Sequence, residues 1–384
     1  MEIQLINFSS QNFFNKFSHR YNIFKEEFQP GIFGIEIRNI SLNLSAMLKE
    51  VFNSANALCY TSYLINGEID LLIIGAFNDL KKLTKNIFSK ENKDLGHKIF
   101  TLINNYENYN YLKYKIGNKE FDFQYPYLMG ILNVTPDSFS DGGLYLNEDD
   151  AVHHAIEMLD SGADIIDIGA ESTRPGSDRV SSDDELKRLI PVIKEILIQR
   201  KDAIISVDTT KEIVAEKALA SGAKIINDIS GLTFESSILN VVKEQDAALV
   251  IMHIKGTPKN MQLNPKYDDV VKEVYNFLSD KVLLAKRKGV EKIFIDPGIG
   301  FGKRLEDNIN LINRLEDLKC IGTPILIGVS RKSFLGHMID ADVNSRDTAT
   351  SIVEAVAIKN GAKVIRTHNT GNGIQVNKIM NFLN

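Results

Sequence analysis

Cysteine is scarce in this chain of 384 residues, which has only Cys59 and Cys320. The two cysteines lie far apart in the sequence and lack the spacing of metal ligands, which argues against a disulfide scaffold and a cysteine-based zinc site. No apolar run approaches the roughly 20 residues that a membrane span needs. The N-terminal segment lacks a charged region followed by a continuous apolar one, so a secretory signal is not expected. The default prediction is a cytoplasmic protein without a membrane partner.

An excess of basic residues is absent as well. The chain has 45 Lys and Arg residues against 50 Asp and Glu residues, and its formal net charge is −5. Proteins that bind nucleic acids usually carry a basic excess, so no nucleic-acid partner is expected. The hydrophobic share of 43% and the charged share of 25% are those of an ordinary globular protein.

From about residue 127 onward, short apolar runs alternate with longer segments of helical periodicity. Each run is apolar throughout, which is typical of a parallel strand that is buried on both faces. The eight runs span 127–133, 164–169, 203–207, 224–227, 247–252, 292–296, 324–329 and 363–367. Helix-like segments between them span 149–161, 183–199, 211–221, 268–288, 305–318 and 346–360.

Eight such units over roughly 250 residues predict a (β/α)8 barrel, the TIM barrel. The competing α/β architecture is a doubly wound sheet, which usually has fewer strands and carries a G-x-G-x-x-G turn after its first strand. That turn is absent, and the glycine-rich stretch 298–302 follows the sixth run without the fingerprint spacing. We therefore expect an α/β fold with a TIM barrel over 111–384.

The residues before the barrel predict a separate unit. Strand-like runs at 31–37 and 70–77 and helix-like segments at 41–52 and 79–90 indicate a small N-terminal α+β domain of unknown role over 1–107. The polar stretch 104–110 indicates a linker. Alternating residues around Gly117 and Asn118 predict a β-hairpin over 111–123, which we assign to the barrel.

Polar side chains follow the apolar runs one after another, at the strand ends where the loops of a TIM barrel converge on the active site. Any single one of them is explained equally well as a helix cap or a loop residue. The whole set is not, because caps do not require Arg, Lys and His. Asp208, Asn227 and Asp296 suit a flat heterocycle with an amino group and a ring N–H, since a carboxylate accepts two parallel hydrogen bonds from such an edge.

Cations and oxygen ligands complete this predicted rim. The cations suit an anion such as phosphate, with Thr173 and Ser177 as hydroxyl donors, and they are Arg174, Lys332, Arg366 and His368. Asn133 and Asp141 offer oxygen atoms to Mg2+, which keeps water and substrate phosphates among its ligands.

Motifs occur in order along the barrel, one for each predicted strand. They are GILNVTPDSFSDGG (130–143), GAESTRPGS (169–177), SVDTTK (206–211), NDISG (227–231), MHIKGTPKNMQ (252–262), DPGIGFGK (296–303), GVSRKSFLG (328–336) and RTHN (366–369). This succession resembles the dihydropteroate synthases, which join a pterin pyrophosphate to p-aminobenzoate in folate biosynthesis. The resemblance extends from about residue 111 to the end of the chain, and the first two motifs and the seventh are highly specific.

The resemblance implies a role for each matching residue. The pterin ring would be held by Asp208, Asn227, Asp296 and Lys332, with Met252 and Phe301 packed near it. Asn133 would bind Mg2+ and, together with Thr173, Arg174, Arg366 and His368, the diphosphate. The p-aminobenzoate pocket would be bordered by Phe139, Pro175, Lys332 and Ser333. The implied catalytic residues are Asp208, Asp296, Lys332 and Asp141, the last in a loop that closes over the site.

Some positions depart from the family pattern. Ala170 stands where a second Gly is common, and Thr367 and Asn369 stand where Val and Asp are common. Neither departure removes a group assigned above. The resemblance also implies a homodimer.

Two other functions stay open. One is a pterin-dependent methyltransferase that works with a corrinoid protein, although it has no need for the STRPG and SRKS elements. The other is a non-catalytic pterin-binding module, against which the cationic rim argues.

Overall fold

The computed structural model describes residues 1–8, 11–24, 28, 31–53, 57–64, 67–88, 93–135, 148–172, 176–177 and 179–383. The chain divides into two compact units. One comprises Met1–Tyr109 with Glu316–Gly322, and the other comprises Asn110–Leu315 with Thr323–Asn384. In the described part of the chain, no helix is both long and apolar enough to cross a membrane.

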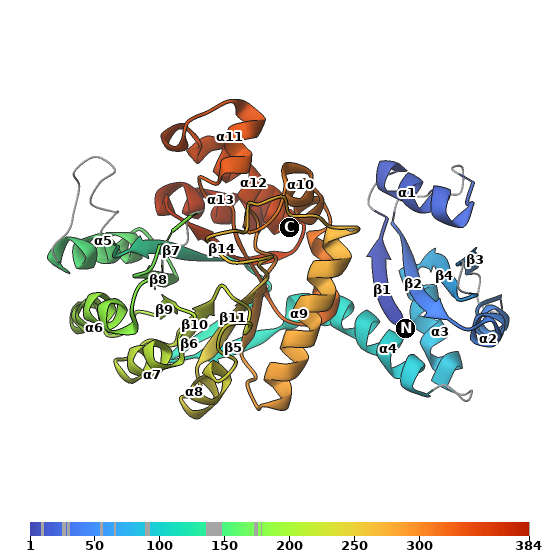
Figure 1. Cartoon of the computed structure of the whole chain (residues 1–384), viewed down its shortest axis with the longest axis horizontal. Coiled ribbons are helices and arrows are strands. Elements are labelled where there is room, and N and C mark those ends of the chain that lie inside the picture. The colour runs from blue at the N-terminus through green and yellow to red at the C-terminus, as the bar shows by residue number, and fades with distance from the viewer. Residues whose placement is uncertain are drawn as a thin grey trace. The chain divides into compact units, whose positions relative to one another are not determined.

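The larger unit contains a closed barrel of parallel strands (Figure 1). Neighbouring strands follow the chain order, and the last strand, β14, pairs in parallel with the first, β7. The strands are β7 (Tyr127–Asn133), β8 (Ile165–Gly169), β9 (Ile205–Asp208), β10 (Ile225–Asp228), β11 (Ala248–Met252), β12 (Ile293–Asp296), β13 (Ile325–Gly328) and β14 (Ala362–Thr367). Most of them are buried along their whole length, because the barrel interior covers one face and helices cover the other. The predicted TIM barrel is confirmed.

Helices follow the strands around the barrel (Figure 1). They are α5 (Glu148–Asp160), α6 (Ser182–Gln199), α7 (Glu212–Ala220), α8 (Ile238–Glu244), α9 (Val270–Arg287), α10 (Leu305–Asn313), α11 (Ser333–Ile339), α12 (Asp347–Lys359) and α13 (Thr370–Leu383), with a 3-10 turn at η5 (Val343–Ser345). The 3-10 turn η4 (Leu315–Ile321) belongs to the smaller unit from Glu316 onward. The start of α6 shows the local physics, since the Ser181 hydroxyl accepts a hydrogen bond from Asp184 N at 3.2 Å and three acidic residues occupy the first turn.

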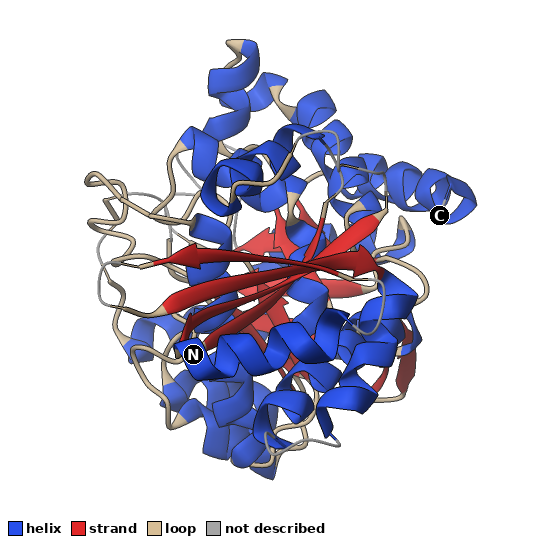
Figure 2. Ribbon diagram, turned by 90° about the vertical axis from the view of Figure 1, so that its right-hand side faces the viewer, coloured by secondary structure: helices blue, strands red, loops and turns tan. Residues whose placement is uncertain are grey.

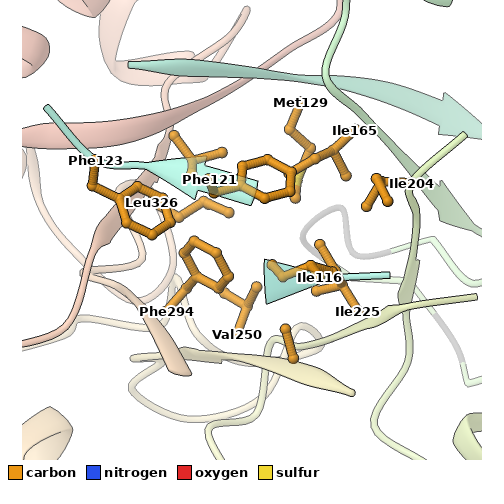
Figure 3. Close-up of a cluster of buried hydrophobic side chains, with 12 residues drawn as sticks. Ile116, Phe121, Phe123, Met129, Ile165, Ile204, Ile225, Val250, Phe294 and Leu326 are labelled. Atoms are coloured by element: carbon orange, nitrogen blue, oxygen red, sulfur yellow. The ribbon is translucent and has the colours of Figure 1, made fainter. Parts of the chain in front are cut away.

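A hairpin fills the N-terminal end of the barrel. It consists of β5 (Lys113–Ile116) and β6 (Lys119–Asp122), paired antiparallel. Ile116, Phe121 and Phe123 pack against residues near the starts of the barrel strands, among them Ile165 and Phe294, in one buried apolar cluster (Figure 3). This end of the barrel is therefore a hydrophobic core.

The smaller unit is an α+β domain with one antiparallel sheet in the order β1-β2-β4-β3. The strands of this sheet are drawn in red at the front of Figure 2. Its strands are β1 (Glu2–Asn7), β2 (Ile32–Ile40), β3 (Leu58–Tyr63) and β4 (Ile69–Ala76), and its helices are α1 (Gln11–Tyr21), α2 (Leu42–Asn53), α3 (Phe77–Phe88) and α4 (Lys93–Asn108), followed by η2 (Tyr109–Tyr111). Phe14, Phe17 and Tyr21 of α1 pack on Ile6 and Leu72 of the sheet.

The predicted linker over 104–110 contains the boundary between the two units, after Tyr109, but it is helical instead of an irregular polar segment. Residues up to Asn108 belong to α4, and Tyr109 in the following 3-10 turn is only 1% exposed. The apolar residues of α4, among them Leu102 and Ile103, recur with helical spacing and are buried. The asparagines and tyrosines that follow them gave the segment its polar appearance in the sequence.

Candidate active site

The trio predicted to hold a heterocycle lies at the C-terminal edge of the barrel. Asp208 ends β9, its neighbour Asn227 lies in β10, and Asp296 ends β12. All three side chains are buried, with 9%, 3% and 5% of their surface exposed, respectively. Polar groups that are buried at the ends of parallel strands are directed to a common site, because these ends meet at one face of a TIM barrel.

Asp167 joins this trio, although it was absent from the predicted site. It lies within β8 and is fully buried. Its Oδ2 accepts hydrogen bonds from Asn227 Nδ2 at 3.0 Å and from Arg366 Nε at 2.6 Å. Its Oδ1 has no hydrogen-bond partner among the described residues. The sequence signal was a carboxylate inside the apolar run IIDIG, a position where a charge is retained only with a partner.

Arg366 lies between two carboxylates. Besides the bond to Asp167, its Nη2 donates to Asp208 Oδ2 at 3.4 Å. Burial and the nearby Asp167 carboxylate raise the pKa of Asp208 well above its usual range, while Arg366 opposes that rise. The predicted anion-binding arginine is thus already paired, and Asp208 keeps a proton more readily than an ordinary aspartate.

Lys332 and Asp296 form the opposite side of the site. Lys332 Nζ donates to the carbonyl oxygen of Ile299 and lies 4.6 Å from the centre of the Phe301 ring. Burial lowers the pKa of Lys332 to about 8, against the opposing influence of Asp296. Burial likewise raises the pKa of Asp296, whose Oδ1 accepts a hydrogen bond from Gly298 N at 2.7 Å.

A second buried lysine, Lys303, holds the loop after β12 from within, and the sequence reasoning did not identify it. Its Nζ donates to Gly298 O at 2.8 Å and Phe301 O at 3.0 Å, and lies 3.0 Å from His253 Nδ1. Burial lowers the pKa of Lys303 to about 7, and burial and Lys303 together lower the pKa of His253 to about 2. His253 is therefore neutral and accepts from Lys303.

Close packing fixes the same loop. A Cβ atom at Gly298 would lie 1.9 Å from the carbonyl oxygen of His253, and Gly298 has a φ of +67°. No other residue fits such an approach without moving the backbone. This packing also places Phe301 against an apolar cluster of Ile229, Met252, Ile254 and Met261. Met252 and Phe301, both predicted beside the heterocycle, lie in this one apolar wall.

Of the remaining predicted residues, the structure describes His368, Ser333 and Asn133. Ser330 Oγ accepts a hydrogen bond from His368 N at 3.1 Å and lies 3.0 Å from His368 Nδ1. Ser333 is exposed at the start of α11, and Asn133 is exposed at the end of β7. Phe139, Asp141, Thr173, Arg174 and Pro175 fall outside the described residues.

A metal site built wholly from protein ligands is absent from the described residues, which contain no cluster of three or more His, Cys, Asp or Glu side chains that could hold an ion. Among the described residues predicted for the site, Asn133 offers an exposed amide oxygen at the end of β7. One such oxygen fits Mg2+, which is often held by one or two protein ligands together with water and substrate phosphates.

Comparison with known proteins gives a consistent result. Residues 129–368 match the family model described as pterin binding enzyme. The chain is 46% identical over 272 residues to a dihydropteroate synthase of Synechocystis, an alignment that covers 70% of this chain and 94% of that protein. The chain belongs to the dihydropteroate synthase family.

Solved structures agree with this assignment. The dihydropteroate synthase of Yersinia pestis, in complex with a sulfonamide drug, aligns with a TM-score of 0.67 at 38% identity, over 71% of this chain and 99% of that one. The enzyme of Xanthomonas albilineans, in complex with 7,8-dihydropteroate, aligns with a TM-score of 0.64 at 34% identity, over 71% and 98% of the two chains. These relatives do not favour the methyltransferase alternative.

A cavity of about 340 Å3 adjoins the family site on the side of β9 and β10. Asp208, Thr209, Ile229, Phe234, Thr257 and Lys259 are among its lining residues. Asp208 thus belongs to the buried carboxylate cluster and also lines the cavity. A ligand in this cavity can reach the cluster from the strand ends.

Proposed function

We propose that this chain condenses 6-hydroxymethyl-7,8-dihydropterin pyrophosphate with p-aminobenzoate to form 7,8-dihydropteroate and diphosphate. The observation that carries the proposal is the buried cluster of Asp167, Asp208, Asn227 and Asp296 beside the cations Lys332 and Arg366. Carboxylates and an amide complement the donor-rich edge of a pterin, and cations complement a diphosphate. The resemblance of the motifs and the complex of the Xanthomonas relative with 7,8-dihydropteroate support the same substrates.

Each half of the pterin substrate has its own partners in this proposal. The edge of the pterin ring forms hydrogen bonds with Asp208, Asn227 and Asp296. Lys332 binds the ring from the other side of the site. Met252 and Phe301 pack on the face of the ring. Arg366 and His368 bind the diphosphate, together with Thr173 and Arg174. Arg366 then exchanges part of its pairing with Asp167 and Asp208 for the ligand.

The chemical step needs no nucleophilic side chain. The aniline nitrogen of p-aminobenzoate attacks the pterin methylene carbon, the C–O bond breaks, its electron pair leaves with diphosphate, and the nitrogen loses a proton. Negative charge grows on the leaving group, and the cations preorganised at the mouth stabilise it. Asp208 and Asp296 stabilise the positive charge that develops on the pterin when they are ionised, a state that Arg366 and Lys332 favour against the effect of burial.

We also propose Mg2+ as the metal, with Asn133 as its protein ligand. When bound, it neutralises diphosphate charge and favours departure of the leaving group. Phe139, Pro175, Lys332 and Ser333 border the p-aminobenzoate in this proposal, and Asp141 lies in the loop that closes over the site.

Further parts of the proposal concern assembly and location. The chain acts as a cytoplasmic homodimer, as the family resemblance implies. Exposed apolar side chains on α12 and α13, namely Ile352, Val356, Ile379 and Phe382, support a dimer that covers them.

The test is diphosphate release by the purified chain in the presence of Mg2+ and the pterin pyrophosphate, with and without p-aminobenzoate. We expect release only with both substrates, together with formation of dihydropteroate. Binding of the pterin without any release would contradict the proposed enzyme and favour a binding module.

A further inference from the structure

The loops after β13 and β14 are attached to one carboxylate that no motif includes. Asp347 lies in the first turn of α12. Its carboxylate accepts hydrogen bonds from Arg331 Nε at 2.7 Å and Arg331 Nη2 at 2.9 Å, and from Asn369 Nδ2 at 2.9 Å. Nη2 and Nδ2 meet at the same oxygen, Oδ2. Asp347 therefore links the residue that precedes Lys332 to the residue that follows His368.

Arg331 adopts a backbone conformation that needs such support. Its φ is +55°, in the left-handed region, where a residue with a side chain is disfavoured by about 1 kcal/mol or more. The first turns of α12 bind both of its main-chain polar groups. Arg331 N donates to Thr350 Oγ1 at 3.1 Å, and the Arg331 carbonyl oxygen accepts from Arg346 Nη1 at 3.0 Å.

The approach of Arg346 depends on a glycine in α11. A Cβ atom at Gly336 would lie 2.4 Å from Arg346 Nη2, so a larger residue would displace the guanidinium. The same guanidinium also donates to the Ala341 carbonyl oxygen from Nε at 3.1 Å and from Nη2 at 3.0 Å. Arg346 therefore has one defined position, from which it holds the Arg331 carbonyl.

The second connection between the two loops lies next to the first. Ser330 accepts from His368 N, as described above, so residues 330–331 are joined to residues 368–369 at two points. Lys332 and His368 are the neighbours of these joined residues in sequence. Their relative placement is thus set by hydrogen bonds of Ser330, Arg331 and Asn369.

We propose that Asp347 is a positioning residue of the reaction, which holds Arg331 in its left-handed turn and thereby fixes Lys332 relative to His368. The proposal rests on the proposed function, because it assigns Lys332 to the pterin and His368 to the diphosphate. Asn369 is its matched partner. A neutral amide donates to Asp347, whereas the aspartate that is common at this position in the family would place a second carboxylate against it.

Three variants test this proposal by moving the carboxylate from position 347 to position 369. Asp347→Asn removes the anion that binds Arg331, and Asn369→Asp adds an anion beside Asp347. The double variant Asp347→Asn/Asn369→Asp again has one carboxylate and one amide next to Arg331, in exchanged places. The matched control is Asp342→Asn, which removes a carboxylate of the same region that caps η5 through Asn344 N and Ser345 N.

We expect each single variant to lower kcat by roughly 10- to 100-fold, because small misplacements of substrate-binding groups have effects of that size. The double variant should recover to within about threefold of the original chain, and the control should stay within about twofold. Turnover is measured per folded molecule, well below the melting temperature of each variant. Single variants with near-normal kcat, or a double variant no better than the worse single one, would overturn the proposal.

Crystal structures of the variants separate this proposal from the proposed function. In Asp347→Asn we expect Arg331 to leave the left-handed region and Lys332 Nζ to leave the Ile299 carbonyl, and both to return in the double variant. Unmoved Arg331 and Lys332 would overturn the positioning role of Asp347 even if the chain had no turnover.

If Asp347→Asn does not fold, Asn369→Asp and the double variant decide by the same two measurements, kcat and the crystal structure. Lack of turnover in the unaltered chain contradicts only the proposed function.

Discussion

The two ends of the barrel strands differ in what they bury. At the N-terminal end, Ile116, Phe121 and Phe123 of the hairpin cover the strand starts with apolar side chains. Toward the other end of the same strands, carboxylates such as Asp167 and Asp296 are buried as well, with 0% and 5% of their surface exposed. Apolar burial is worth about 25 cal/mol per Å2, whereas buried ion pairs contribute little net stability. The comparison indicates that one end of each strand stabilises the fold and the other end serves the ligand.

The largest expected effect on the apolar end comes from Phe123→Ala. Phe123 is fully buried against Tyr114, Phe121 and Phe294, so its truncation should lower the free energy of unfolding by about 3–5 kcal/mol. Turnover per folded molecule should not change. Urea unfolding and diphosphate release measure the two quantities. A loss of turnover without a loss of stability would show that the N-terminal end of the barrel also serves the reaction.

The reverse result is expected for Asp296→Asn at the polar end. Loss of the carboxylate opposite Lys332 should lower kcat/KM by roughly 100- to 1000-fold, a typical effect of removing a preorganised charge. The melting temperature should shift by only a few degrees, because the replacement has nearly the same shape. Near-normal turnover would exclude Asp296 from the mechanism.

Lys303 gives an intermediate effect with a defined pH dependence. Its pKa in the folded protein is about 7, lowered by burial from an ordinary 10.5. Between these values the unfolded chain binds a proton that the folded one lacks, so stability rises as pH increases through this window. At ~1.4 kcal/mol per pKa unit, the full difference between the two pKa values corresponds to a rise of about 5 kcal/mol, of which about 4 kcal/mol falls below pH 10.

The variant Lys303→Met should lack this rise. Unfolding by urea, compared between the two proteins from about pH 6 to about pH 10, measures the difference. Parallel curves for both proteins would show that Lys303 does not titrate in this window.

The smallest effect is expected for a charge at the apolar end. Lys119 of the hairpin donates to Asp164 Oδ1 at 2.6 Å, but 38% of its side chain is exposed. Exposed pairs of this kind contribute at most about 1 kcal/mol. Lys119→Met should therefore change the unfolding free energy by less than that and leave turnover unaltered. A large loss of stability or of turnover would contradict the comparison, because it would show that a charge at the N-terminal end of the barrel is as important as the charges at the other end.

The barrel could be predicted from the sequence because its strands are buried on both faces and therefore appear as unbroken apolar runs. In the smaller unit, the buried strands at 32–40 and 69–76 were predicted, whereas β1, α1 and β3 were not. The edge strand β3 is partly exposed throughout, and its sequence LCYTSY has no clear pattern.

The predicted site residues followed from their position at strand ends, and the missed ones depended on tertiary partners. Lys303 and Asp347 gain their roles from His253, Arg331 and Asn369, which come close only in the folded chain. Nothing in the local sequence distinguishes Asp347 from the many aspartates that begin helices. Asp167 did carry a local signal, a charge within an apolar strand.

The hairpin closes the floor of the barrel with apolar side chains, so a ligand of the buried carboxylates approaches them from the carboxyl ends of the strands. In the proposed reaction, the substrate that binds deeper would therefore have to enter before the substrate that binds nearer the rim.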